Sequence, residues 1–113
     1  MSISIRLQDK IILRCKNSIF SILHETIMKI IEKKKLKLNK LISYVLDELD
    51  QNIWGLGMVS LDISNYLKTK KDVVLFAQLV NESIHSLEKN NVLADFALEA
   101  LKNFHQELIK YYE

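Results

Sequence analysis

The chain of 113 residues contains no proline and only two glycines, which restricts the folds open to it. Turn-rich β folds need special backbone angles at many corners, and glycine and proline usually supply them. Long helices with short connections need few such residues. The length also suits one hydrophobic core better than two. We therefore predict one helical domain that spans residues 1–113.

The spacing of apolar residues predicts four main helices. Apolar positions recur at steps of three and four over about 8–33, 37–50, 73–87 and 92–111, as on one face of a helix. The predicted fold class is all-α: an antiparallel four-helix-type bundle with a short extra helix or bend around residues 53–67. The opening Ile3-Ser4-Ile5 alternates like a strand, but we expect an extended lead, with strand addition in a dimer as the alternative.

Local signals mark the ends of the later helices. Thr69 and Asp72 have the spacing of a capping box, in which side chains accept hydrogen bonds from free N–H groups at a helix start. Asn90-Asn91 follows the third apolar stripe, and asparagine tolerates the left-handed turn that ends helices. The short connection predicts that the last two helices are antiparallel neighbours.

The residues that usually carry chemistry do not form a known site. A zinc site needs about four ligands with close paired spacing, whereas His24, His85 and His105 are far apart in the sequence. Glu82 and His85 match half of a di-iron motif, and there is no second half. Cys15 lies on an apolar stripe, where a buried, inert thiol is the default. We predict no catalytic residue, no metal and no cofactor.

Cysteine content and hydropathy bear on location. Cys15 is the only cysteine, so an internal disulfide is impossible, which suits a reducing compartment. The N-terminus lacks the pattern of a signal peptide. The apolar stretch 11–31 is interrupted by charged residues, whereas a membrane span needs about 20 mostly uncharged ones. We expect a cytoplasmic protein without a membrane partner.

The charges are segregated along the sequence. Residues 1–40 hold ten Lys or Arg against three Asp or Glu, and residues 41–113 hold six against eleven. The basic run consists of lysines between Lys29 and Lys40. Lysines there could contact phosphates, but the run lacks arginine and interleaved aromatic residues, which favours a solvated helix end.

The second half of the chain offers a different surface. Residues 41–67 contain four acids and no Lys or Arg, and aromatic residues lie near them. Aromatic anchors supply buried area at an interface, while acids steer a basic partner. Trp54 fits either this role or that of a plug in the core. The predicted partner-binding residues are Tyr44, Asp47, Glu48, Asp50, Trp54, Asp62 and Tyr66.

In size, helicity and its acidic, aromatic surface, the chain resembles small helical bacterial immunity proteins. The resemblance is generic, and the residues that carry it are Asp47, Glu48, Asp50, Trp54, Asp62 and Tyr66. It implies a protein that binds and neutralises a cognate toxin, often a nuclease with a basic cleft. The net charge of +2 departs from the acidic charge typical of immunity proteins that bind nucleases.

These observations predict a non-enzymatic, protein-binding module, an immunity- or antitoxin-type inhibitor whose partner is a protein with a basic surface. Two alternatives stay open. One is a nucleic-acid-associated regulator that uses the lysines of 29–40. The other is a helical scaffold or oligomerisation subunit, in which the apolar stripe of the first helix forms the seam of a homodimer.

Overall fold

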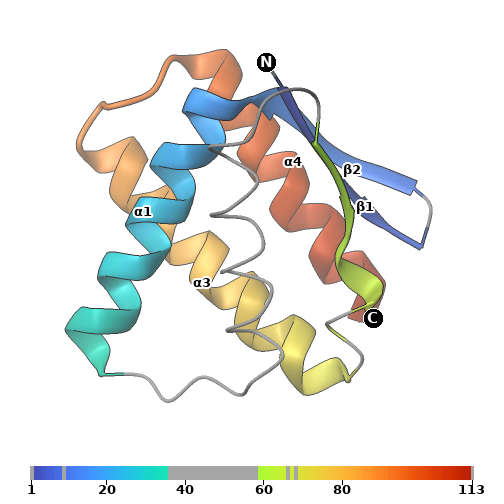
Figure 1. Ribbon diagram of the computed structural model, residues 1–113. Coiled ribbons are helices and arrows are strands. Elements are labelled where there is room, and N and C mark those ends of the chain that lie inside the picture. The colour runs from blue at the N-terminus through green and yellow to red at the C-terminus, as the bar shows by residue number, and fades with distance from the viewer. Residues whose placement is uncertain (1, 9, 36–58, 66, 68, 113) are drawn as a thin grey trace.

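The computed structural model is a mixed α and β fold (Figure 1) and describes residues 2–8, 10–35, 59–65, 67 and 69–112. Within these residues, three long helices pack beside a three-stranded sheet. The predicted all-α four-helix bundle is therefore wrong. The helix predicted over 37–50 lies outside the described residues, and so does most of the bend predicted at 53–67.

The sheet joins segments from both ends of the first 62 residues. Its strand order is β2-β1-β3, with β1 at Ser2–Leu7, β2 at Lys10–Lys16 and β3 at Val59–Asp62. Strands β1 and β2 are antiparallel, and β3 runs parallel to β1. Gln8 lies at the turn between β1 and β2 with φ of 52°, in the left-handed region. The N-terminal strand thus has partners on both sides.

The segment predicted as the first helix, 8–33, forms both a strand and a helix. Its N-terminal part is β2, which continues directly into α1 at Asn17–Lys34. The consecutive apolar residues at 11–13 fit either period, and β-branched isoleucine packs well in strands. Pairing decides between them, because Leu13 lies opposite Ile5 and both side chains are buried.

The extra helix predicted within 53–67 is also wrong in the part that the structure describes. This part forms β3, followed by the 3-10 turn η1 at Ile63–Asn65. The physical reason is again pairing with a distant segment: Leu61 of β3 lies in register with Ile5 of β1. Such contacts leave no mark in the local spacing.

The two C-terminal helices follow the local signals closely. Helix α3 covers Lys70–Lys89, and the Thr69 hydroxyl accepts a hydrogen bond from the backbone N–H of Asp72 at 3.2 Å, which confirms the predicted cap. Asn91 takes a left-handed φ of 54° just beyond α3. Helix α4 covers Asp95–Tyr112 and packs against α3, as expected for neighbours.

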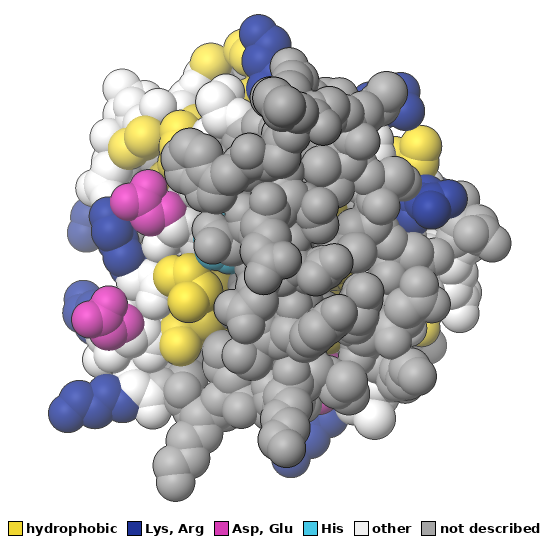
Figure 2. Space-filling model, in the orientation of Figure 1, with side chains coloured by type: hydrophobic (Ala, Val, Ile, Leu, Met, Phe, Trp, Pro, Cys, Tyr) yellow, Lys and Arg dark blue, Asp and Glu magenta, His cyan; other side chains and the backbone are white. Residues whose placement is uncertain are grey.

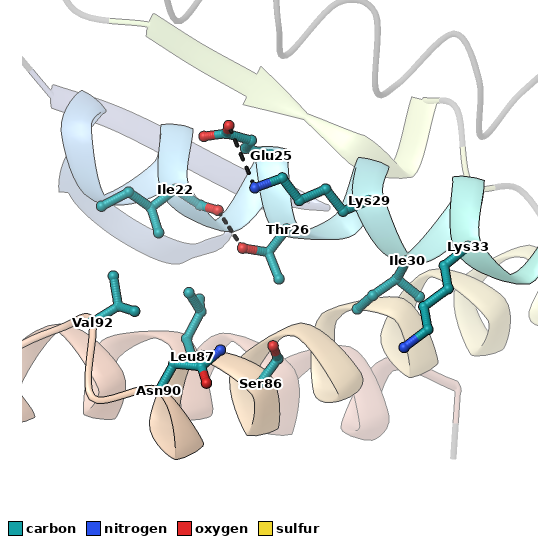
Figure 3. Close-up of a pocket in the computed structure, with 10 residues that line it drawn as sticks. All are labelled: Ile22, Glu25, Thr26, Lys29, Ile30, Lys33, Ser86, Leu87, Asn90 and Val92. Atoms are coloured by element: carbon teal, nitrogen blue, oxygen red, sulfur yellow. Dashed lines mark hydrogen bonds and ion pairs between the residues drawn. The ribbon is translucent and has the colours of Figure 1, made fainter.

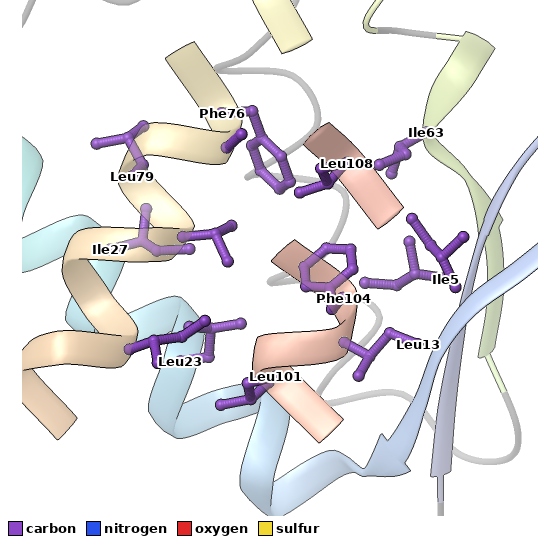
Figure 4. Close-up of a cluster of buried hydrophobic side chains, with 14 of the residues drawn as sticks. Ile5, Leu13, Leu23, Ile27, Ile63, Phe76, Leu79, Leu101, Phe104 and Leu108 are labelled. Atoms are coloured by element: carbon purple, nitrogen blue, oxygen red, sulfur yellow. The ribbon is translucent and has the colours of Figure 1, made fainter. Parts of the chain in front are cut away.

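Helix α4 lies between the sheet and the other helices, so the core has apolar contributions from both sides (Figures 1 and 4). Ile5 and Leu13 of the sheet point toward Phe104 and Leu101 of α4. On the other side the rings of Phe104 and Phe76 meet edge to face, with centroids 6.3 Å apart. Among the described helices, none is long and apolar enough to cross a membrane.

Candidate functional site

The predicted partner-binding surface falls mostly outside the described residues. This holds for six of its seven members: Tyr44, Asp47, Glu48, Asp50, Trp54 and Tyr66. The seventh, Asp62, ends β3 and occupies the position in register with Arg6 of β1.

The basic run is described as far as Lys35, at the end of α1. Lys34 forms an ion pair with Glu82 of α3, and Lys29 is 3.8 Å from Glu25 one turn earlier on α1. Figure 2 shows described lysine and carboxylate side chains next to one another along the left margin of this face. These pairings reduce the positive potential that a nucleic acid would meet. Lys33 has no ion pair within the described part of the chain.

Helices α1 and α3 enclose an open groove that the sequence did not reveal (Figure 3). Its larger hollow has a volume of about 440 Å³, and a second hollow of about 390 Å³ adjoins it. The two share Ile30, Lys33 and Ser86, so they form one continuous feature, here called the α1–α3 groove. Its lining is Ile22, Glu25, Thr26, Lys29, Ile30, Lys33, Lys34, Asn81, Glu82, His85, Ser86, Leu87, Asn90 and Val92.

The floor of the α1–α3 groove is apolar and its two rims differ. Ile22 and Ile30 point from α1 toward α3, and Val92 closes one end (Figure 3). Lysines follow the α1 rim, whereas the α3 rim carries mainly neutral polar side chains such as Asn81 and Ser86. An apolar floor with a cationic rim can hold an amphipathic segment of a protein.

A second surface lies where α3 passes into α4, and its main feature is an exposed aromatic ring. Phe96, in the first turn of α4, is 71% exposed, the highest value among the large apolar residues described as exposed. Residues three and seven positions later, Glu99 and Asn103, share its side of the helix. A shallow hollow beside it is lined by Glu88, Asp95, Leu98, Glu99, Lys102 and Asn103. We call Phe96 together with this hollow the Phe96 corner.

The Phe96 corner has an excess of negative charge. Glu88 pairs with Lys102, which holds the pKa of that carboxyl below its usual range through a hydrogen bond and the lysine charge. Asp95 and Glu99 have no ion pair within the described part of the chain. The corner thus combines an aromatic anchor with two acids that form no ion pair with a described residue.

Sequence reasoning overlooked Phe96, although a signal was present. The inward stripe predicted for the last helix comprised Leu93, Ala97, Ala100, Leu101, Phe104 and Leu108. Four of these residues are buried, while Leu93 and Ala100 are partly buried against the core. Phe96 lies off that stripe, between Asp95 and an alanine. An aromatic residue outside the buried face of a helix is a candidate contact residue, and this rule would have identified it.

Two of the groups that could take part in chemistry have shifted pKa values. Burial raises the pKa of the Cys15 thiol to about 11, partly offset by a backbone hydrogen bond at Phe20, so the thiol stays protonated near neutral pH. Burial, and then the charge of His85, lower the pKa of His105 below its usual value. No three His, Cys, Asp or Glu side chains gather as a metal site within the residues described.

Comparisons with known proteins leave the fold and the two surfaces as the basis for any functional argument. The chain matches no protein-family model, and neither the curated proteins nor the solved structures contain a significant match.

Proposed function

We propose that this chain is a non-enzymatic binding protein, an immunity- or antitoxin-type inhibitor that neutralises a cognate bacterial toxin in the cytoplasm by binding to it. The observation that carries the proposal is the Phe96 corner. Phe96 leaves 71% of its surface in water, although an aromatic side chain gains free energy when it is buried. Contact with a partner would recover that free energy.

The charge of the corner indicates the kind of partner. Asp95 and Glu99 line the hollow of the corner and have no ion pair in the described part of the chain, so they favour a basic surface. The proposal extends to the acidic, aromatic residues of 44–66, which would enlarge the same kind of interface. The ion pairs of Lys29 and Lys34 weigh against the alternative of a phosphate-binding surface on α1.

Capture experiments with matched variants test the proposal. The chain, Phe96→Ala and Asp95→Asn/Glu99→Gln are immobilised and exposed to a lysate of the cells that encode the protein. Ile11→Ala is the control for the ring, because Ile11 is also an exposed apolar residue, at 47%, but lies on β2. A true partner is retained by the chain and by the control, and binds Phe96→Ala about tenfold or more weakly.

The inhibitor function is then tested in cells with the captured partner. Expression of that partner should arrest growth, and coexpression of the chain should restore growth. Coexpression of Phe96→Ala should restore growth less. Replacing Asp47, Glu48 and Asp50 by lysine should also weaken the complex. A captured partner that is not toxic, or that remains active in the complex, rejects the inhibitor function. Retention that is independent of both sets of acids rejects the assigned surface.

A further inference from the structure

We propose that the α1–α3 groove is a docking site for an acidic amphipathic helix of a partner protein. The two hollows share three lining residues, so the feature is long rather than round. Its α1 side extends from Ile22 to Lys34. At a rise of 1.5 Å per residue this is about 18 Å, slightly more than three turns of a helix. The inference is independent of the Phe96 corner.

The walls of the groove favour a helical occupant over an extended one. Both walls are helices, whose backbone N–H and C=O groups are already bonded within α1 and α3. An extended peptide would bring unpaired backbone groups against Ile22, Ile30 and Leu87, which is costly. A helix satisfies its own backbone and offers apolar side chains at three- and four-residue spacing to this floor.

The charges on the rims favour acidic flanks on the occupant. The α1 rim carries Lys29, Lys33 and Lys34, and Lys33 has no ion pair in the described chain. The acids Glu25 and Glu82 are each within ion-pair distance of a lysine. An approaching carboxylate can therefore pair with Lys33, which no described acid engages, whereas an approaching lysine would compete for acids that are already paired.

The same residues indicate which contacts the occupant would make. Val92, at one end of the groove, is 53% exposed, so an apolar side chain placed there would cover it. Thr26 is not free to bind the occupant through its hydrogen, because its hydroxyl donates to the carbonyl of Ile22 at 2.8 Å. The contacts that remain are apolar along the floor, polar toward Ser86 and Asn90, and ionic toward Lys33.

A designed peptide probes the site directly. The probe is a fluorescent helix of four turns, with leucine along one face and glutamate on both flanks; a second probe has lysine in place of every glutamate. Fluorescence anisotropy should show that the acidic probe binds about tenfold more tightly than the lysine probe. Equal binding of the two probes, or stronger binding of the lysine probe, would overturn the proposal.

Exposed substitutions locate the binding without disturbing the core. Lys33→Glu and Val92→Asp should each weaken the acidic probe about tenfold. Lys71→Glu, an exposed reversal outside the groove, and Phe96→Ala should leave its affinity within about twofold. The Lys29→Glu/Lys33→Glu protein should prefer the lysine probe, which is a gain that misfolding cannot produce. If this variant still preferred the acidic probe, the assignment of Lys29 and Lys33 to the binding rim would be contradicted.

A second copy of the chain is the competing occupant. Sedimentation velocity of the free protein decides this, because the proposal expects a monomer whose profile is the same for Val92→Asp. A dimer that Val92→Asp dissociates would show that the groove is a self-association surface and would overturn the proposal. Loss of acidic-probe binding in Phe96→Ala would overturn it as well, since both surfaces would then act as one.

Discussion

The α1–α3 groove runs along helix α3, whereas the Phe96 corner lies on α4 and includes only Glu88 of α3, and the two surfaces differ in nearly every property that matters for binding. The groove is concave, with an apolar floor, and two of its lysines are already paired with acids. The corner presents one exposed ring together with Asp95 and Glu99, which have no ion pair among the described residues. The difference teaches that a small net charge of +2 is compatible with one surface that favours acidic partners and another that favours basic partners.

The largest expected effect separates core from surface within one helix. Phe104 is fully buried and contacts Phe76, whereas Phe96, two turns earlier, is 71% exposed. Phe104→Ala should lower the free energy of unfolding by about 3–5 kcal/mol, because it leaves a cavity. Phe96→Ala should change it by less than about 0.5 kcal/mol. Urea denaturation measures both, and a large loss in Phe96→Ala would mean that the ring supports the fold.

The next effect concerns helix α3, which lines the groove and contributes Glu88 to the corner. Thr69→Ala removes the acceptor for the Asp72 N–H at the start of α3. We expect a loss of about 1 kcal/mol in unfolding free energy. Thr69→Ser keeps the hydroxyl and serves as the control, so an equal loss in Thr69→Ser would show that the methyl group, rather than the cap, is responsible.

A smaller effect is the coupling energy of the ion pairs in the two regions. Lys34–Glu82 crosses the groove, and Lys102–Glu88 lies at the corner. All four side chains are about half exposed, so solvent screens both pairs. Double-mutant cycles to alanine should give coupling of about 0.2–1 kcal/mol for Lys34–Glu82, decreasing with salt. Coupling well above that range would mean that the groove is more rigid than its exposure indicates.

The smallest effect is a dependence of stability on pH. Burial, aided by the charge of His85, lowers the pKa of His105 in the folded chain. The unfolded chain therefore binds a proton at His105 more readily, so this contribution lowers stability as pH falls through the unfolded pKa near 6.5. The loss ends below the folded pKa. His105→Gln should remove it, as measured by thermal unfolding between pH 5 and 8.

An NMR titration separates the two causes of that shift. His85→Gln should raise the pKa of His105 without restoring its ordinary value, because burial is the larger cause. Full restoration would assign the shift to the His85 charge instead.

What the sequence predicted correctly was local. The Thr69 cap and the buried face of α3 depend on residues within a few turns of one another. The pairing of β3 with β1 was missed because it joins segments that are distant in sequence, as where Ile3 meets Val59. The β1–β2 hairpin is local, and β2 was missed because its apolar residues fit either a helix or a strand. The groove likewise depends on how α1 approaches α3, which spacing does not encode. Phe96 was within reach of sequence reasoning, since it lies outside the inward stripe of α4.

The claim that the two surfaces bind independently is tested most directly by two titrations of the acidic helical probe. The first uses the free chain, and the second uses the chain saturated with the partner captured through Phe96. Isothermal titration calorimetry should give dissociation constants that agree within about twofold, because the groove stays open in the complex. Failure of the probe to bind the saturated chain would contradict this account, since partner and probe would then compete for one surface.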